Sequence, residues 1–301
     1  HESLCVRYIW WRHVFCMRYH GKRLNIQRAK RIFIVCVVAV LTVSWYFWPD
    51  NRPFVSICMP TKNRRAFIPT AIKIFQSQTY PQHLMEWIIV DDGDEPVGDL
   101  FKDIPNAKYY RTKPMALGAK RNFVHSKTSG DILVYMDDDD FYPPTRVEHA
   151  VERLMTNRDA LIAGCDVMFI YYADLDKVYR FGPYWDNHAT AGSFAFKRQL
   201  LQLTNYKSTD KMTEERSFLH DYTFPLIQLD TEQCILCISH SKNTFDKHKI
   251  LKSGKLTSFT LEHFVKDEDI IKRIRETATS VATPHGTHAH QWRPTKLPPP
   301  N

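Results

Sequence analysis

Two spacings of apolar residues alternate along the first half of the chain: continuous runs, and residues three and four positions apart. Short apolar runs at residues 54–59, 87–90 and 132–136 are bounded by Pro, Gly or Asp and are typical of buried strands, and residues 108–111 are expected to form a further strand. Between these runs, apolar residues three and four positions apart predict amphipathic helices. Two stripes show this spacing, Ile68-Ala71-Ile72-Phe75 and Val147-Ala150-Val151-Leu154, and residues 116–128 are also expected to be helical. The alternation predicts an α/β fold with a mostly parallel sheet and helices on both faces.

The pattern changes after residue 158. Residues 160–172 and 178–181 are expected to be extended around a turn at 174–176, and residues 192–203 to form a loop and a helix. Residues 226–239 predict a further strand and 259–278 a charged C-terminal helix. Residues 279–301 lack a core pattern and are expected to be disordered.

Residues 32–48 form an uncharged apolar stretch that predicts a membrane anchor. A helix of this length would span roughly 25 Å, which suits a thin bilayer, and Trp45, Tyr46 and Trp48 gather at its end. A cleaved signal peptide and a buried helix are the alternatives. The basic residues before the stretch place the tail in the cytosol, so we expect a single-pass type II protein that faces the Golgi or ER lumen in a eukaryote.

The distribution of charge argues against nucleic acid as a partner. Residues 1–31 carry eight Lys or Arg and one Glu, which leaves only +1 of the net charge of +8 for the other 270 residues. The basic character therefore belongs to the predicted cytosolic tail, and the body is nearly neutral.

The cysteines do not suggest a disulfide framework. Cys58 and Cys165 lie in apolar runs and are expected to be buried thiols. Cys234 and Cys237 have the spacing of a redox or zinc pair, but the sequence offers no second pair. We therefore expect these four residues to be structural.

Four consecutive aspartates, Asp137–Asp140, directly follow the predicted strand at 132–136. The carboxyl end of a parallel strand is the edge at which open α/β sheets bind ligands. Crowded carboxylates repel one another unless a cation or protons neutralise them, and oxygen ligands suit Mg²⁺ or Mn²⁺. A metal site is therefore predicted here, with a solvated acidic turn as the alternative.

Four segments in order resemble a known family. They are residues 55–64 (VSICMPTKNR), 88–93 (IIVDDG), 118–122 (GAKRN) and 130–140 (GDILVYMDDDD). Their order and spacing resemble the inverting GT-A-fold glycosyltransferases of family 2, strongly over 53–145 and more weakly over 146–245. The resemblance implies a GT-A catalytic domain at 54–250, with a nucleotide-binding half (54–145) and an acceptor half (146–250). A linker at 49–53 would precede this domain and a helical segment at 251–278 would follow it.

The resemblance assigns the nucleotide-binding half its donor site. Asp91 or Asp92 would bind the nucleotide base, and four residues after the first strand would line the same pocket: Pro60, Thr61, Asn63 and Arg64. Lys120 or Arg121 would supply positive charge to the diphosphate. A solvated helix face is the alternative for the last pair.

In this family, the aspartate cluster corresponds to the DxD motif. We align Asp137-Asp138-Asp139 with it, so that Asp139 is the best candidate metal ligand and Asp137 the next, with Asp137 and Asp138 also at the donor. His240, after the last predicted strand, resembles a late histidine that binds metal or phosphate in some GT-A enzymes, and His248 competes for this role. The expected cofactors are Mn²⁺ or Mg²⁺ and a nucleotide-sugar, with a UDP-sugar as the expected donor.

The acceptor half should supply a general base, because inversion needs a proton acceptor on the sugar face opposite the diphosphate. Glu215 aligns with the aspartate to which the family usually assigns this role, and Glu214 and Asp221 are alternatives. Glutamate here departs from the family pattern. Trp185 is either a platform for a sugar ring or a core residue.

We therefore expect a membrane-anchored, metal-dependent inverting glycosyltransferase that acts on a glycan, glycoprotein or lipid-linked acceptor. One alternative is a sugar-phosphate nucleotidyltransferase, although residues 60–64 lack the glycines that such enzymes carry after the first strand. The other is a catalytically inactive carbohydrate-binding protein. The sequence does not indicate an oligomeric state.

Overall fold

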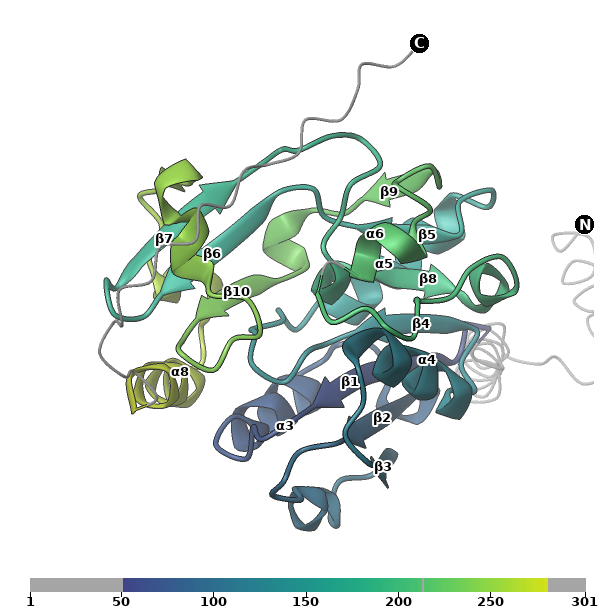
Figure 1. The fold of residues 1–301 in the computed structure, drawn as a ribbon, viewed down its shortest axis with the longest axis horizontal. Coiled ribbons are helices and arrows are strands. Elements are labelled where there is room, and N and C mark those ends of the chain that lie inside the picture. The colour runs from purple at the N-terminus through teal and green to yellow at the C-terminus, as the bar shows by residue number, and fades with distance from the viewer. Residues whose placement is uncertain (1–50, 213, 281–301) are drawn as a thin grey trace, which may run out of the picture. The chain divides into compact units, whose positions relative to one another are not determined.

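The computed structural model of the protein describes residues 51–212 and 214–280 (Figure 1). Its strands are β1 (Val55–Thr61), β2 (Met85–Asp91), β3 (Ala107–Arg111), β4 (Ile132–Tyr135), β5 (Ile162–Gly164), β6 (Met168–Tyr172), β7 (Lys177–Phe181), β8 (Ala195–Lys197), β9 (Leu226–Gln228), β10 (Leu236–Ser239) and β11 (Lys255–Leu256). Its α-helices are α3 (Ile68–Gln76), α4 (Leu117–Lys127), α5 (Arg146–Thr156), α6 (Glu214–Phe218), α7 (Leu261–Phe264) and α8 (Glu268–Ser280). Short 3₁₀ helices are η1 (Gln82–Leu84), η2 (Gly98–Phe101), η3 (Ala191–Ser193), η4 (Arg198–Gln202), η5 (Thr231–Gln233) and η6 (Lys247–Ser253).

The predicted parallel sheet is present in the first half of the domain. The larger sheet has the strand order β3-β2-β1-β4-β8-β5-β9, and β3, β2, β1 and β4 run parallel. In its register, Cys58 lies beside Tyr135 and Thr61 beside Asp91. The carboxyl ends of β1, β2 and β4 therefore meet at one edge, and the order reverses between β1 and β4, where such sheets bind ligands.

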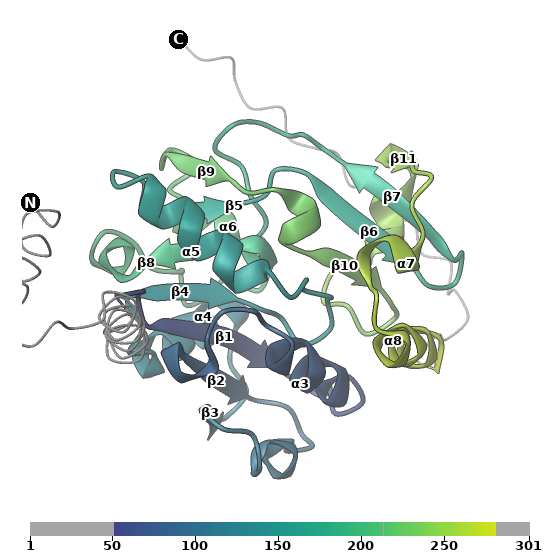
Figure 2. The ribbon, with the colours of Figure 1, turned by 180° about the vertical axis from the view of Figure 1, so that it is seen from behind.

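Helices cover both faces of this sheet, as the sequence predicts. Alternate residues of β1 enter opposite cores: Ile57 and Met59 pack with α3 and α5, whereas Cys58 packs with α4 and α6. Figure 1 shows the α4 face and Figure 2 the face covered by α3 and α5. This two-sided burial explains why the first strands are apolar at nearly every position.

Trp87 of β2 is the centre of the core under α3. Its ring stacks on Phe75 at a centroid distance of 4.5 Å and meets the edge of Phe101 at 5.2 Å. We expect Trp87→Ala to lower the free energy of unfolding by about 3–5 kcal/mol, because it leaves a large cavity. Urea denaturation measures this loss. Trp87→Phe should lose clearly less, and equal losses in the two variants would contradict the packing argument.

The second half of the domain departs from the sequence-based expectation in several places. The extended segment predicted at 160–172 is two strands, β5 and β6, which belong to different sheets. The segment 192–203 contains a strand, β8, which inserts antiparallel between β4 and β5 and is followed by a 3₁₀ helix. The predicted strand at 226–239 is two strands in different sheets, separated by η5, whose first turn is capped by the Asp230 side chain. The predicted C-terminal helix is likewise divided into α7 and α8.

A second sheet has the order β10-β6-β7-β11. The hairpin predicted around 174–176 is its centre, with β6 and β7 antiparallel. The sequence predicts a helical segment at 251–278, but this segment also contains strand β11, which pairs with β7 in this sheet. Asp140 and Phe141 join this sheet to the end of β4: the Asp140 carboxylate accepts a hydrogen bond from the backbone of Ile238 (2.8 Å), and Phe141 bridges to Leu236.

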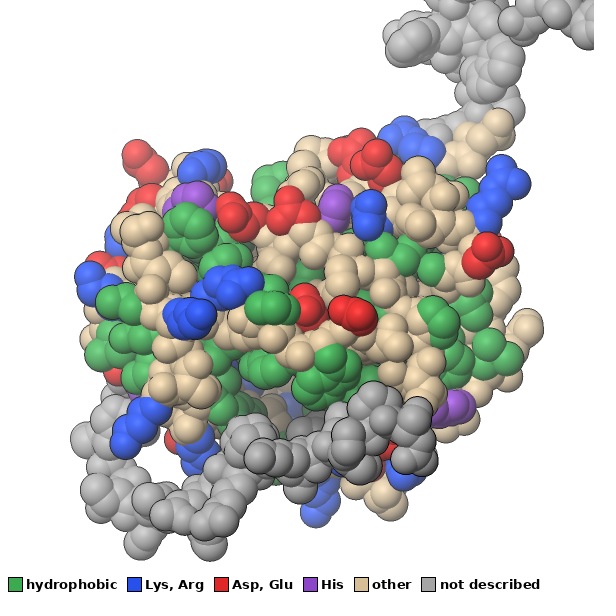
Figure 3. All heavy atoms as spheres, turned by 90° about the horizontal axis from the view of Figure 1, so that it is seen from above, with side chains coloured by type: hydrophobic (Ala, Val, Ile, Leu, Met, Phe, Trp, Pro, Cys, Tyr) green, Lys and Arg blue, Asp and Glu red, His purple; other side chains and the backbone are tan. Residues whose placement is uncertain are grey.

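The predicted anchor at 32–48, the basic tail before it and residues 281–301 lie outside the described residues. Within 51–212 and 214–280, no helix combines the length and the apolar character needed to cross a bilayer. Figure 3 shows acidic and basic side chains interspersed with hydrophobic ones on the face seen from above. The described residues therefore give that face no single sign of charge.

Candidate active site

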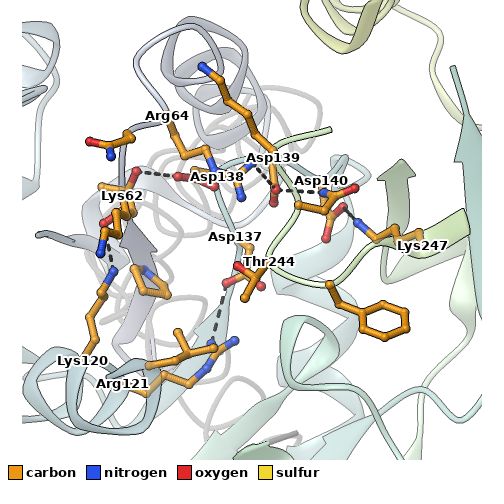
Figure 4. A pocket seen from close by; sticks show the side chains of 17 residues that line it. Lys62, Arg64, Lys120, Arg121, Asp137, Asp138, Asp139, Asp140, Thr244 and Lys247 are labelled. Atoms are coloured by element: carbon orange, nitrogen blue, oxygen red, sulfur yellow. Dashed lines mark hydrogen bonds and ion pairs between the residues drawn. The ribbon is translucent and has the colours of Figure 1, made fainter. Parts of the chain in front are cut away.

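A cavity of about 600 Å³ opens at the carboxyl ends of β1 and β4 (Figure 4). One wall comes from the residues after β1, a second from α4, a third from the four aspartates after β4, and a fourth from the segment 242–247 after β10. The charged residues of these walls are Lys62, Arg64, Lys120, Arg121, Asp137, Asp138, Asp139, Asp140, Lys242 and Lys247. Six basic and four acidic side chains suit an anionic ligand more than a neutral one.

Two of the four aspartates connect neighbouring strands to the end of β4. Asp138 is buried and accepts a hydrogen bond from the Thr61 hydroxyl, and burial, with Asp139 beside it, raises the pKa of Asp138 to about 8. Asp140 faces Ile238 and Lys247, and burial raises its pKa to about 6. These two carboxylates hold β1 and β10 against the end of β4.

The other two aspartates have oxygens suited to a ligand. Asp139 Oδ2 lies 2.8 Å from Arg64 Nη1 and 3.0 Å from His240 Nε2, and Arg64 holds the pKa of Asp139 well below its usual range although burial opposes this. Asp137 Oδ1 is buried, lies 3.7 Å from Arg121 Nη1, and has no hydrogen-bond partner among the described residues. Burial raises the pKa of Asp137. An orphaned carboxylate oxygen in a cavity wall is costly and is relieved when a cation binds.

Helix α4 places two cations in the opposite wall. Lys120 pairs with Asp92 and donates to the carbonyl oxygen of Thr61. Arg121 Nε lies 2.7 Å from Glu214 Oε1, and its guanidinium lies 4.5 Å from the centre of the Tyr135 ring. Both side chains line the cavity, so the solvated helix face that the sequence left open is wrong.

The helix reaches this position because Gly118 has no side chain. A Cβ there would lie 2.1 Å from the backbone oxygen of Lys207. Only glycine allows such a close approach between the start of α4 and the segment before α6. The same contact brings Arg121 to Glu214.

The residues predicted to bind the nucleotide are divided by the structure. Pro60, Thr61, Asn63 and Arg64 line the cavity. Asp91 and Asp92 lie outside the cavity wall and are fully buried. Asp91 accepts hydrogen bonds from the Gly93 and Val97 amides and the Tyr109 hydroxyl, and Asp92 accepts one from the Met115 amide. In this structure, both shape the loops beside the cavity.

The three candidate bases have different surroundings. Glu214 is buried against Arg121. Glu215 is half-buried, and burial, with Glu214 adjacent, raises its pKa to about 7. Asp221 is exposed and pairs with Arg216 at 2.5 Å, which lowers its pKa. Burial therefore gives Glu215 a pKa that suits a proton acceptor near neutral pH.

The two histidines are also separated. His240 lies at the end of β10 beside Asp139 and Arg64, whereas His248 lies 3.4 Å from Asp174 and against the Tyr172 ring. His240 is therefore the histidine that contacts the cavity residues Asp139 and Arg64, although it does not line the cavity itself. Burial lowers its pKa although Asp139 opposes the effect, so the ring is neutral at neutral pH.

Sequence reasoning missed the wall formed by residues 242–247. Asn243 donates to Asp139 Oδ2 (3.2 Å), and Lys247 donates to the Ile238 carbonyl (2.8 Å) beside Asp140. The polar residues that directly follow the strand ending at Ser239 were the available signal, because this strand also ends at the cavity.

Cys234 and Cys237 are buried free thiols.

Comparison with known proteins identifies a family. The profile described as "Glycosyl transferase family 2" matches residues 56–219, more than half of the chain. An uncharacterized glycosyltransferase of Bacillus subtilis, YwdF, is 35% identical over 107 residues, covering 34% of this chain and 38% of that protein. One of Haemophilus influenzae is 27% identical over 128 residues, covering 39% and 50%. The chain spans 19% of a similar uncharacterized glycosyltransferase of Rickettsia felis.

One solved structure shares the fold. The mannosyltransferase PcManGT from Pyrobaculum calidifontis, in complex with GDP-Man and Mn²⁺, superposes with a TM-score of 0.51 at 17% identity and covers 68% of this chain and 62% of that one. This likeness confirms the predicted GT-A-like α/β fold.

Proposed function

Because the chain belongs to glycosyl transferase family 2, we propose that it moves a sugar from a nucleotide-sugar to a hydroxyl of a carbohydrate-bearing acceptor, with inversion at the anomeric carbon. The cavity at the ends of β1 and β4 carries this proposal, because its six basic and four acidic side chains suit a diphosphate together with a cation. The acceptor class is a glycan, a glycoprotein or a lipid-linked sugar.

The side chains at the cavity fit a divalent cation that binds the protein and a phosphate group at the same time. Among the described residues, no group of three or more His, Cys, Asp or Glu side chains could hold a metal alone. Mg²⁺ commonly takes only one or two carboxylates and fills its other positions with water and substrate phosphates. Asp139 and the orphaned oxygen of Asp137 supply such a pair, with His240 beside Asp139. When bound, the cation would neutralise charge that develops on the leaving diphosphate.

The protein's own residues bind the rest of the donor. Arg121 and Lys120 lie on the wall opposite the aspartates and would contact the diphosphate oxygens, while Pro60, Thr61 and Asn63 would border the nucleoside. Asp91 and Asp92 are buried outside the cavity wall, so they would act on the base only through the loops that they shape. A UDP-sugar is the proposed donor; PcManGT, which shares the fold, was solved with GDP-Man and Mn²⁺.

Glu215 would take the proton in the transfer step. The acceptor hydroxyl oxygen forms a bond to the anomeric carbon, its proton passes to the Glu215 carboxylate, and the bond from that carbon to the phosphate oxygen breaks with its electron pair. Glu214 is engaged with Arg121 and Asp221 with Arg216, so neither is as available as Glu215.

The proposed location is a membrane, with residues 32–48 as a single type II anchor and the catalytic domain in the lumen. The apolar sequence of this segment and the basic residues before it support the proposal.

Donor turnover without an acceptor tests the function. We expect slow hydrolysis of one or more UDP- or GDP-sugars that requires Mn²⁺ or Mg²⁺. The nucleoside diphosphate that this hydrolysis releases measures its rate. A dependence on pyrophosphate or a nucleoside triphosphate would instead indicate a nucleotidyltransferase. If the protein catalyses neither reaction, with or without candidate acceptors, it is an inactive carbohydrate-binding protein.

A further inference from the structure

A cluster of four aromatic side chains lies outside the cavity on the acceptor half. Tyr184 and Trp185 remain 43% and 41% exposed, which is unusual for side chains of this size. Trp185 lies 4.6 Å from the His188 ring and 5.3 Å from the Tyr222 ring, and Tyr184 lies 4.6 Å from His188. Two exposed rings are thus held against a buried His188.

The loop that carries three of these rings is fixed. The Gln228 side chain of β9 donates to the carbonyl oxygens of Asp186 (2.7 Å) and His188 (3.0 Å), and the His188 amide donates to the Trp185 carbonyl (2.9 Å). A platform held in this way loses little conformational entropy when a ligand binds.

The fourth ring comes from a strained turn. His220, Asp221 and Tyr222 all have left-handed backbone angles, with φ of 48°, 57° and 63°. Three successive residues other than glycine in this region are costly, and such strain persists where the surrounding structure imposes it, often at binding sites. The turn directs Tyr222 onto Trp185 and His188.

His188 also offers an unused polar atom. Its side chain is more than nine-tenths buried among the rings, and Nδ1 has no hydrogen-bond partner among the described residues. Burial lowers the pKa of His188 to about 4, so the ring is neutral and brings no charge to the cluster. A buried nitrogen without a partner costs free energy that a ligand hydroxyl would recover.

The cluster is adjacent to the proposed chemistry. The turn that carries Tyr222 folds back onto α6, because the Asp221 amide donates to the Arg216 carbonyl (2.9 Å). Tyr222 and Glu215 are the next residues along the chain from this hydrogen bond. On the other side, His188 precedes Gly192 by four residues, a reach of at most about 14 Å. A Cβ on Gly192 would lie 3.1 Å from Asp137 Oδ2, so this chain segment connects the cluster with the cavity wall.

We propose that Tyr184, Trp185 and Tyr222, with His188 beneath them, form the acceptor subsite and bind a pyranose ring by its apolar C–H face. This inference rests on the proposed function, since it places the acceptor sugar beside Glu215. Exposed aromatic faces suit the apolar face of a sugar ring, and the exposed Asp186 and partly exposed Asn187 on the same loop offer polar atoms to its hydroxyls. The rings of Tyr184 and Tyr222 stand at 78° and 89° to that of Trp185, so one ring face can stack on the sugar while the others border it. A rigid arrangement of this kind selects a cyclic sugar over an open-chain polyol.

Saturation-transfer NMR with methyl β-D-glucopyranoside and methyl N-acetyl-β-D-glucosaminide tests the subsite, with sorbitol as an open-chain control. We expect transfer from aromatic protons to ring C–H protons of at least one glycoside and none to sorbitol. Trp185→Ala should weaken glycoside binding about tenfold or more, whereas Trp185→Phe should retain much of it. Leu203→Ala, at an exposed residue outside the cluster, serves as the matched control and should bind as the unchanged protein does.

Equal transfer to sorbitol, or unchanged affinity in folded Trp185→Ala, would overturn the subsite. If Trp185→Ala does not fold, 5-fluorotryptophan incorporated at position 185 provides a second measurement. A shift of its ¹⁹F signal on adding glycoside supports the subsite, and no shift overturns it. A protein that hydrolyses donor but binds neither glycoside contradicts only this inference, whereas absent donor turnover contradicts the proposed function.

Discussion

Glu215→Gln is expected to lower the rate of sugar transfer by about 10²–10⁴-fold, the usual contribution of a positioned general base. Glutamine keeps the shape of the side chain but cannot accept the proton. Donor binding should persist, because the cavity walls do not include Glu215. Transfer rate and nucleotide affinity, measured on the same preparation, separate the two effects.

The pH dependence of the transfer rate tests independently whether Glu215 is the general base. The pKa of Glu215 is raised to about 7, and a base acts only when deprotonated. The rate should therefore rise with pH up to about 7 and level off above it. The raised pKa also means that the folded protein binds this proton more tightly than the unfolded chain, so this group's contribution to stability falls as pH rises towards 7. Glu215→Gln should lack both effects.

Two further substitutions decide whether the loss is specific. Glu152→Gln changes an exposed glutamate on α5 and should leave transfer unchanged. Asp221→Asn tests the exposed alternative. Full activity in Glu215→Gln together with a large loss in Asp221→Asn would move the base to Asp221.

Asp139→Ala is expected to abolish the part of donor affinity that depends on Mn²⁺, a loss on the order of 100-fold for a metal-bridged diphosphate. The substitution also removes the partner of Arg64, which lies 2.8 Å away. A freed guanidinium in the cavity attracts phosphate, so affinity without metal should be unchanged or higher. Calorimetric titration of UDP and GDP with Mn²⁺ and with a chelator measures both quantities.

The control for Asp139→Ala is Asp103→Asn, an exposed aspartate away from the cavity, which should retain the full effect of Mn²⁺. If Asp139→Ala still binds UDP or GDP more tightly with Mn²⁺ than without it, to the same degree as the unchanged protein, then Asp139 is not the metal ligand. Loss of binding both with and without metal would indicate a general collapse of the site.

The nucleotide-binding half could be predicted because its information is local. Three of the strands, β1, β2 and β4, are largely apolar runs, and the polar residues that follow them mark the edge where the strands end. The positions of the aspartates followed from this rule, whereas Thr61 and Lys120 were assigned by the family resemblance. Strand β8 escaped prediction because its three residues acquire their structure from distant partners, such as Leu133 beside Phe196.

The different roles of identical side chains within the site could not be predicted. Four identical aspartates follow one another, and only their partners distinguish them: Asp138 meets Thr61, Asp140 meets Ile238, and Asp139 meets Arg64. Similarly, Glu214 and Glu215 are neighbours in sequence, but the contact with Arg121 separates their roles. These distinctions depend on side-chain partners that are far away in the chain.

The segment 242–247 has a consequence for how the protein can be divided. It lies beyond residue 219, where the match to the family ends, yet it forms the cavity wall beside Asp139 and Asp140. A fragment trimmed to the family boundary would keep the aspartates and Arg121 but lose this side of the pocket. During synthesis on the ribosome, the pocket would likewise stay incomplete until residues 242–247 had emerged.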